Sequence, residues 1–357
     1  MTVRLTANSS QHATAHPNAA HDLAAPIRLA IIGTNWITER FVRAAIESGA
    51  FCLTAVYSRQ LVQAQHFADK FAPSLRCFTD LTQMAASDQF DAVYIASPNS
   101  LHYEQSVLML SHHKHVICEK PLASNRRQVE HLFEVAKANN RVLFEAYKTP
   151  YTPGFLSIKQ RLTTLGEIRR AYFNFCQYSS RYPRYLAGEN PNTFNPAFSN
   201  GSIMDIGYYC VAAAVELFGA PETVNASAKL LPSGVDGHGS VVMHYPEFEV
   251  QISHSKVSNS YLGSEIQGEL AALQIQSISE ATGIVLKAKG IADQAVDVTQ
   301  DDNDMRYEAD YFAQQIHAGA LCEAAKQRSL TVASLLDEIR AQTGVVFPAD
   351  NQDLITL

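Results

Sequence analysis

The sequence lacks several features that mark other classes of protein. It has 28 Lys and Arg against 35 Asp and Glu, so no basic surplus exists to neutralise nucleic-acid phosphates. No uninterrupted apolar run approaches the roughly 18 residues that a membrane span needs. The six cysteines form no C-x-x-C pair, which predicts reduced, mostly buried thiols and a cytoplasmic protein. We therefore expect no nucleic-acid, membrane or metal partner.

Two segments are weak candidates for metal sites. Residues 1–25 contain His12, His16 and His21 but are polar and lack aromatic residues, so a flexible N-terminal extension is the prediction. The acidic run Asp301-Asp302-Asn303-Asp304 lacks the spacing and the glycine of a calcium loop. A solvated loop before a helix is the prediction for that run.

Strands and helices alternate between residues 26 and 150. This order predicts an α/β fold, with a Rossmann-type doubly wound parallel sheet whose ligand lies at the carboxyl ends of the strands. The expected strands are Ile27–Ile32, Phe51–Tyr57, Arg76–Phe78, Asp91–Ser97, His115–Cys118 and Arg141–Ala146, and the expected helices are Ile37–Ser48, Leu61–Phe71, Leu101–Ser111 and Ser124–Asn139.

The pattern changes in residues 151–357. Consecutive strand-like runs predict an α+β domain with a large, mainly antiparallel open sheet, which would bind substrate and another subunit. The final helices could pack back on the first domain. The expected strands are Arg169–Tyr178, Val224–Leu230, Ser240–Tyr245, Val250–Val257, Tyr261–Gln267, Ala271–Ile278 and Gly283–Lys287, and the expected helices are Gly154–Thr164, Ile203–Phe218, Tyr307–Lys326 and Thr331–Thr343.

The first strand-to-helix turn departs from the G-x-G-x-x-G pattern of dinucleotide loops. It reads Gly33-Thr34-Asn35-Trp36-Ile37-Thr38, so only the first glycine matches. Gly33 can make the sharp turn, and Asn35 tolerates a left-handed backbone well enough to replace the second glycine in part. The free N–H groups at the helix start would attract a pyrophosphate. An ordinary strand–helix turn is an equally good interpretation of this loop alone.

The second strand indicates which dinucleotide would bind. No acidic residue lies between Gly49 and Phe67 to hold the ribose hydroxyls of NAD. The strand ends instead at Ser58 and Arg59, whose hydroxyl and guanidinium groups suit a 2′-phosphate. NADP is the predicted cofactor and NAD the alternative. A solvated surface arginine is the other interpretation of Arg59.

Four later segments together carry a family resemblance. They read Ser97-Pro98-Asn99-Ser100-Leu101-His102, Cys118-Glu119-Lys120-Pro121, Asp205-Ile206-Gly207-Tyr208-Tyr209-Cys210 and Gly344-Val345-Val346-Phe347-Pro348. In this order they resemble the Gfo/Idh/MocA oxidoreductases, and the tyrosine form of the third segment resembles the glucose–fructose oxidoreductase and dimeric dihydrodiol dehydrogenase branch. The resemblance implies hydride transfer between a nicotinamide and a sugar, polyol or diol.

The resemblance also implies site residues. Ser97, Pro98, Asn99 and His102 would border the nicotinamide, Glu119 would lie beside the cofactor, and Lys120 would be catalytic. Lys120 follows a buried strand, where it could exchange a proton with the substrate oxygen. Tyr209 is the candidate general acid or base of the second domain. Asp205, one helical turn before it, would pair with Lys120 or hold a substrate hydroxyl.

Some features depart from the family pattern and leave alternatives open. The segment from Glu145 to Pro153 has Pro150 where related enzymes have an arginine, for which Lys148 could compensate. A catalytically silent protein that senses a dinucleotide, or a homologue that binds no nucleotide, therefore remains an alternative. The open sheet has a face that needs cover, so the resemblance also predicts a homodimer or homotetramer through this sheet.

Overall fold

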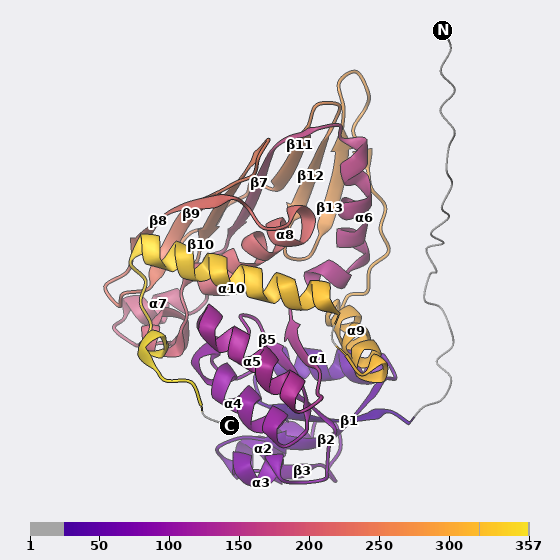
Figure 1. Ribbon diagram of the computed structural model, residues 1–357, viewed down its shortest axis with the longest axis vertical. Coiled ribbons are helices and arrows are strands. Elements are labelled where there is room, and N and C mark those ends of the chain that lie inside the picture. The colour runs from indigo at the N-terminus through magenta and orange to yellow at the C-terminus, as the bar shows by residue number, and fades with distance from the viewer. Residues whose placement is uncertain (1–24, 321, 356–357) are drawn as a thin grey trace.

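The computed structural model describes residues 25–320 and 322–355, which form two sheets connected by helices (Figure 1). The expected extension, with His12, His16 and His21, lies outside the described residues except for residue 25. Among the residues that the structure describes, no group of His, Cys, Asp and Glu could hold a metal ion.

The first half is a parallel six-stranded sheet in the order β3-β2-β1-β4-β5-β6. The predicted doubly wound α/β fold is therefore confirmed. The five-residue helix α3 was not predicted, because it is too short to show a helical period. The elements are β1 (Ile27–Ile32), α1 (Trp36–Glu47), β2 (Phe51–Tyr57), α2 (Leu61–Ala68), β3 (Arg76–Phe78), α3 (Leu81–Ala85), β4 (Ala92–Ile95), α4 (Asn99–Ser111), β5 (His115–Glu119), α5 (Arg126–Ala138) and β6 (Leu143–Ala146).

Both faces of this sheet are buried, which explains its nearly continuous apolar strands. Helix α1 packs on one face, where the ring of Phe41 stacks on that of Tyr94 with centroids 3.9 Å apart. Helices α4 and α5 pack on the other face through residues such as Val107 and Leu132. The order of strands reverses between β1 and β4, so a crevice opens at their carboxyl ends.

The second half contains an eight-stranded sheet in the order β14-β13-β12-β11-β7-β10-β9-β8. Neighbouring strands are antiparallel except for β7 and β10, which are parallel. Two parallel strands need a long crossover connection, and the segment between β7 and β10 includes helices. The elements are α6 (Pro153–Arg161), β7 (Ile168–Cys176), α7 (Tyr182–Leu186), a π-helical turn (Ile203–Gly207), α8 (Tyr208–Phe218), β8 (Thr223–Leu230), β9 (Asp236–His244), β10 (Glu249–Ser255), β11 (Ser264–Gly268), β12 (Ala272–Ser277), β13 (Thr282–Lys287) and β14 (Gln294–Ala295).

The two final helices differ from the prediction. Helix α9 (Met305–Ala318) ends at Gly319, whose φ of +71° suits glycine, and α10 (Glu323–Thr343) begins soon after. The expected helix Tyr307–Lys326 is therefore wrong, because the left-handed backbone of Gly319 ends the helix within that range. Helix α9 packs on α1, and α10 contacts α5, α8 and β8 and thus both halves (Figure 1).

Helix α8 belongs to a long apolar segment. Pro196–Phe218 is long and apolar enough to cross a membrane by composition alone, but 72% of its apolar window is buried inside the protein. It is a core element under the second sheet. The six cysteines are all free, yet only Cys118 and Cys210 are buried, so the expectation that most would be buried is wrong.

A half-buried histidine in the first sheet should make stability depend on pH. His115 Nδ1 accepts a hydrogen bond from the Val142 backbone N–H, at 3.0 Å. Burial and the nearby Arg141 guanidinium lower the pKa of His115 to about 4. An unfolded histidine titrates near pH 6.5, so below that pH the unfolded chain takes up a proton that the folded chain does not. The stabilisation is complete above about pH 6.5 and is lost as the pH falls towards 4.

The His115→Asn variant tests this dependence. Between about pH 7.5 and about pH 5, the free energy of unfolding should decrease in the unchanged protein because of His115. We expect the decrease to be about 1 kcal/mol smaller in the variant. Urea unfolding at the two pH values measures both differences. An equal fall in the two proteins would contradict the assignment of this pH dependence to His115.

Candidate active site

A cavity of about 550 Å³ opens at the crevice between β1 and β4. We call it the nucleotide lobe. Three turns of the first sheet form most of it, and the second half covers it with Arg181, Asn192, Phe198 and Asn200. The remaining lining residues are Ile32, Gly33, Thr34, Asn35, Tyr57, Ser58, Arg59, Gln63, Ala96, Ser97, Pro98, Asn99, Leu101 and Gln105.

The first turn fits a dinucleotide through its glycine and through an asparagine side chain. A Cβ on Gly33, whose φ is +105°, would lie 2.8 Å from the Ala96 carbonyl oxygen, so this position requires glycine. The expectation that Asn35 is left-handed is wrong, since its φ is −88°. Instead its Oδ1 accepts from the N–H groups of Ile37 and Thr38, at 3.0 and 3.1 Å, as the cap of α1. Its Nδ2 donates to Ala96 O, which holds the two turns together.

The positive charge of the nucleotide lobe suits a third phosphate group in addition to the two of the pyrophosphate. Two arginines line it, Arg59 after β2 and Arg181 from the second half, and none of its lining residues is a carboxylate. Ser58 is buried beside Arg59, and its hydroxyl lies 3.3 Å from Gln63 Oε1. Neighbouring guanidinium and hydroxyl donors are suited to the 2′-phosphate of NADP.

A second cavity of about 540 Å³ continues from the first and shares Asn35, Ala96, Ser97 and Asn99 with it. We call it the catalytic lobe. Its floor comes from the first sheet and its far wall from the second half. The other lining residues are Trp36, Ile37, Arg40, His102, Glu119, Lys120, Lys148, Phe175, Gln177, Asp205, Ile206, Tyr209, Lys256, Ser277, Ser279 and Glu280.

The catalytic lobe brings the three predicted catalytic residues together. Lys120 Nζ donates to the Asp205 carbonyl at 2.7 Å and to its Oδ1 at 3.2 Å. Lys256, which we did not predict, bonds to the other carboxylate oxygen. Burial alone would raise the pKa of Asp205, but the ammonium groups of Lys256 and Lys120 outweigh it and lower the pKa. Asp205 is therefore an anion that holds the Lys120 ammonium in place.

Tyr209 lies beside this ion pair. Lys120 Nζ is 4.6 Å from the centroid of its ring. Burial raises the pKa of Tyr209 well above its ordinary value, and the carboxylates of Glu119 and Asp205 act in the same direction. The phenol therefore keeps its proton and can donate it, while the adjacent ammonium can stabilise a developing negative oxygen.

A π-helical turn positions Asp205 and Tyr209. We expected a regular α-helix over Ile203–Phe218, but its first turn, Ile203–Gly207, is π-helical. This wider turn precedes α8, and the Asp205 carbonyl within it accepts from Lys120. A Cβ on Gly207 would lie 2.8 Å from Ile203 Cδ1 and 3.1 Å from the His254 ring, so glycine permits the close packing under this turn.

Two family models match the chain over both halves. Residues 27–147 match an oxidoreductase family with an NAD-binding Rossmann fold, and residues 155–274 match the GFO/IDH/MocA C-terminal domain. The chain belongs to the Gfo/Idh/MocA family. It is an NAD(P)-dependent oxidoreductase of this family, as the sequence motifs imply.

Individual proteins are similar to this chain over nearly its whole length. The uncharacterized oxidoreductase YgjR of Escherichia coli (strain K12) is 56% identical over 92% of this chain and 100% of its own length. The scyllo-inositol 2-dehydrogenase (NADP(+)) IolU of Bacillus subtilis (strain 168) is 47% identical over 91% and 99%. KijD10, a 3-ketoreductase from Actinomadura kijaniata solved with NADP and TDP-benzene, has a TM-score of 0.80 at 23% identity, covering 89% and 98%. This last likeness shows the shared fold.

His102 and Glu119, which belong to two of the family motifs, lie in the wall of the catalytic lobe that carries Lys120. His102 is fully buried, with its ring nitrogens 2.9 Å from the carbonyl oxygens of Ser97 and Pro121, so it links the two turns. The Glu119 carboxylate accepts from the Tyr94 hydroxyl at 2.5 Å. Burial raises the pKa of Glu119, against the opposing effect of Lys120. Both residues thus shape the wall that carries Lys120.

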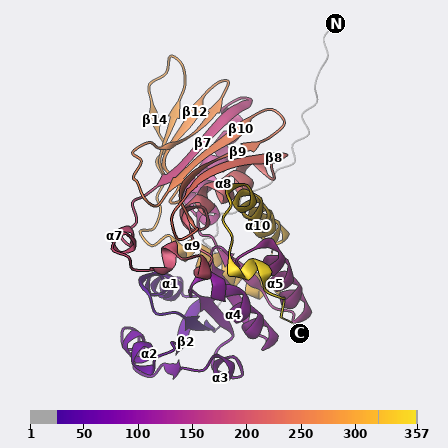
Figure 2. The ribbon, with the colours of Figure 1, turned by 90° about the vertical axis from the view of Figure 1, so that its left-hand side faces the viewer.

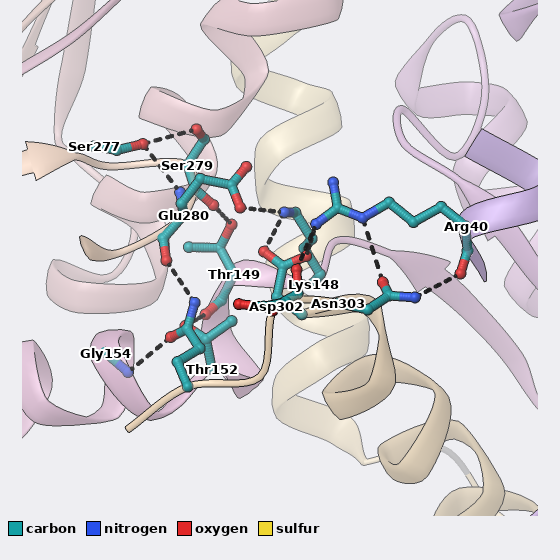
Figure 3. Close-up of polar contacts among 12 residues, drawn as sticks. Arg40, Lys148, Thr149, Thr152, Gly154, Ser277, Ser279, Glu280, Asp302 and Asn303 are labelled. Atoms are coloured by element: carbon teal, nitrogen blue, oxygen red, sulfur yellow. Dashed lines mark hydrogen bonds and ion pairs between the residues drawn. The ribbon is translucent and has the colours of Figure 1, made fainter. Parts of the chain in front are cut away.

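Lys148, which lies two residues before the position where related enzymes have an arginine, connects three parts of the fold. Lys148, after β6, is buried and bonds to Glu280 Oε2 at 2.7 Å (Figure 3). It also bonds to Asp304 at the start of α9. Arg40 of α1 pairs with the same aspartate at 2.8 Å. The expectation that residues 301–304 form a solvated loop is therefore wrong for Asp304, which is buried because Lys148 and Arg40 compensate its charge.

Removing the Lys148 charge should destabilise the fold. Burial and the adjacent Glu280 raise the pKa of Asp304 to about 6, although Lys148 opposes both effects. Without the ammonium, Glu280 loses its counter-ion and the buried Asp304 keeps only Arg40, so we expect Lys148→Met to cost about 3 kcal/mol of unfolding free energy. Urea unfolding at neutral pH measures it. The exposed Lys159, paired with Glu216 at 2.9 Å, supplies the control, and Lys159→Met should cost below about 1 kcal/mol.

The structure adds site residues that sequence reasoning missed. Lys256, Glu280 and Arg181 come from the second half and reach the cavities only through the fold. One signal was available, because His254 and Lys256 follow Ile252 at alternate positions of a predicted strand. Polar side chains on the inward face of a strand indicate a site or a buried ion pair. For Arg181 and Glu280 the sequence offered no comparable signal.

Proposed function

We propose that this protein is an NADP-dependent dehydrogenase or reductase of a cyclic polyol or sugar, acting on a CH–OH group. The main support is that Lys120, Tyr209 and Asp205 surround one cavity that continues into a phosphate-suited nucleotide lobe. The similarity to a scyllo-inositol 2-dehydrogenase supports the polyol class. The bound coenzyme supplies the hydride acceptor or donor.

The chain's own residues would handle the proton. In the reducing direction, Tyr209 donates its phenolic proton to the carbonyl oxygen of the substrate. The Lys120 ammonium, held by Asp205, stabilises the negative charge that develops on that oxygen. In the oxidising direction Tyr209 first releases its own proton to solvent, and its phenolate, stabilised by the Lys120 ammonium, then accepts the hydroxyl proton of the substrate. Ser277, Ser279 and Glu280 on the far wall are suited to bind the remaining substrate hydroxyls.

Trp36 makes the cofactor step measurable, because it is the one tryptophan of the sequence and is 68% exposed at the cavity. We expect NADPH to quench its emission more strongly than NADH at equal concentration. Turnover is then followed by the absorbance of reduced nicotinamide with NADP+ and a series of cyclitols and sugars. Quenching without turnover of any of them would favour a dinucleotide-sensing protein, and a flat titration with both nucleotides would contradict cofactor binding.

We also propose that two copies associate through the second sheet. Helices α8 and α10 lie on one face of it, and in the described part of the chain no helix covers the other (Figure 2). That face carries polar side chains such as Asn225, Gln251 and Gln274. Sedimentation equilibrium should report a dimer or tetramer, and a monomer at micromolar concentration would contradict this proposal.

A further inference from the structure

A third cavity, of about 260 Å³, opens from the catalytic lobe at the end of the second sheet. We call it the side notch. It shares Phe175, Gln177, Ser277 and Ser279 with the catalytic lobe and no residue with the nucleotide lobe. A substrate in the catalytic lobe could therefore extend into the notch without meeting the coenzyme. Its other lining residues are Asn174, Cys176, Asn259, Ser260, Tyr261, Leu262, Gln276 and Ile278.

The chemistry of the notch differs from that of the catalytic lobe. None of its lining residues is charged, whereas Lys120, Asp205, Lys256 and other charged groups line the catalytic lobe. A phosphate or carboxylate placed in the notch would find no cation among these residues to offset its lost hydration. Amide and hydroxyl groups both donate and accept, so they match neutral hydroxyl groups. The lining thus selects an uncharged, polyhydroxylated group.

The notch is held in shape before any ligand binds. The loop between β10 and β11 forms one side and is bonded to β7. The Asn174 amide donates to Ser260 Oγ at 2.8 Å and to the Leu262 carbonyl at 2.6 Å, and the Tyr178 N–H donates to Asn259 Oδ1 at 2.8 Å. A preformed site avoids the entropy cost of ordering a loop upon binding.

Several groups remain available to a ligand. Gln177 and Gln276 are exposed, and neither side-chain amide makes a hydrogen bond within the described residues. Tyr261 is 90% exposed and offers an apolar ring with a polar hydroxyl. A sugar ring has hydroxyl groups along its edge and C–H groups on its faces, so amides and an aromatic ring are complementary to it.

We infer that the side notch binds a second, neutral sugar ring joined to the ring that reacts. The preferred substrate would then be a glycosylated polyol or an oligosaccharide, rather than a free cyclitol. This inference rests on the proposed function, because it places the reacting ring in the catalytic lobe beside Lys120 and Tyr209.

The test compares scyllo-inositol with its mono-O-β-glucoside, using NADP+ and initial rates. We expect kcat/KM to be about tenfold higher for the glucoside, through a lower KM, which corresponds to one good added contact. Tyr261→Ala and Gln276→Ala should each remove most of this advantage and leave the values for scyllo-inositol unchanged. Leu270→Ala and Gln314→Ala are matched controls, since both residues are exposed but line none of the three cavities.

Titration calorimetry provides a readout that does not need turnover. The glucoside is titrated into the NADP+-loaded Tyr209→Phe variant, with and without Tyr261→Ala. Binding that is weakened about tenfold by Tyr261→Ala would support the notch. Equal kinetics of the two substrates together with no effect of Tyr261→Ala would overturn it and leave the proposed function standing. If neither these two substrates nor any other cyclitol or sugar of the series is turned over, the proposed function fails, and the calorimetric difference alone decides whether the notch binds sugar.

Discussion

Replacing Tyr209 by phenylalanine should lower kcat about 10²–10⁴-fold, the range for a lost general acid or base. The variant removes one hydroxyl and keeps the ring beside Lys120, so the KM for substrate and the quenching of Trp36 by NADPH should change little. Steady-state kinetics in both directions measure the loss. The neighbouring Tyr208 supplies the control, because its buried side chain does not line the catalytic lobe. Tyr208→Phe should keep kcat within about twofold.

Lys120→Met should lower kcat to a similar extent, about 10³-fold, since its ammonium stabilises charge in the same transition state. The double variant with Tyr209→Phe should lose only slightly more than either single variant, because residues that act as a unit are not additive. If the decrease of kcat in the double variant equals the product of the two single decreases, the two side chains act in separate steps. Retention of full kcat by either single variant would remove that residue from the proposed acid–base role.

Substituting the arginines of the nucleotide lobe should change the preference for the coenzyme. We expect Arg59→Ala to raise the KM for NADPH about 10–100-fold, the effect of losing a charge-assisted contact, and to leave the KM for NADH nearly unchanged. Arg181→Ala should weaken NADPH in the same sense, because Arg181 lines the lobe from the opposite side. Titration with 2′,5′-ADP and with AMP isolates the contribution of the 2′-phosphate.

Arg76 provides the control for both substitutions. It is an exposed arginine on β3 that lies against the Phe78 ring and does not line the lobe. Arg76→Ala should bind both nucleotides as the unchanged protein does. If Arg59→Ala and Arg181→Ala both retain their preference for 2′,5′-ADP, the phosphate lies elsewhere and the predicted role of these arginines is wrong.

Much of the first half was predictable because its signals are local. The strand Phe51–Tyr57 was predicted at its observed bounds, since a short apolar run between turn residues is typical of a buried parallel strand. Gly33 was predicted from its place after a strand, and its backbone conformation requires glycine. The motif around Lys120 and the motif around Tyr209 were both identified from the order of short segments in one chain.

Other features depended on contacts that no local pattern contains. The bond from Asn35 Nδ2 to the Ala96 carbonyl joins two turns that are 61 residues apart in the chain. The burial of Asp304 depended on Arg40 and Lys148, which come from other parts of the fold.

The sequence by itself determined the type of each sheet, the family and the candidate pair of an amine and a phenol, because these follow from local periodicity and from short motifs. Only the tertiary structure decided that Lys256 shares Asp205 with Lys120, that Arg181 covers the nucleotide lobe and that an uncharged notch extends the catalytic lobe. Each of these brings together segments separated by dozens of residues. Such contacts arise when the sheets pack, and the spacing of residues along the chain does not specify them.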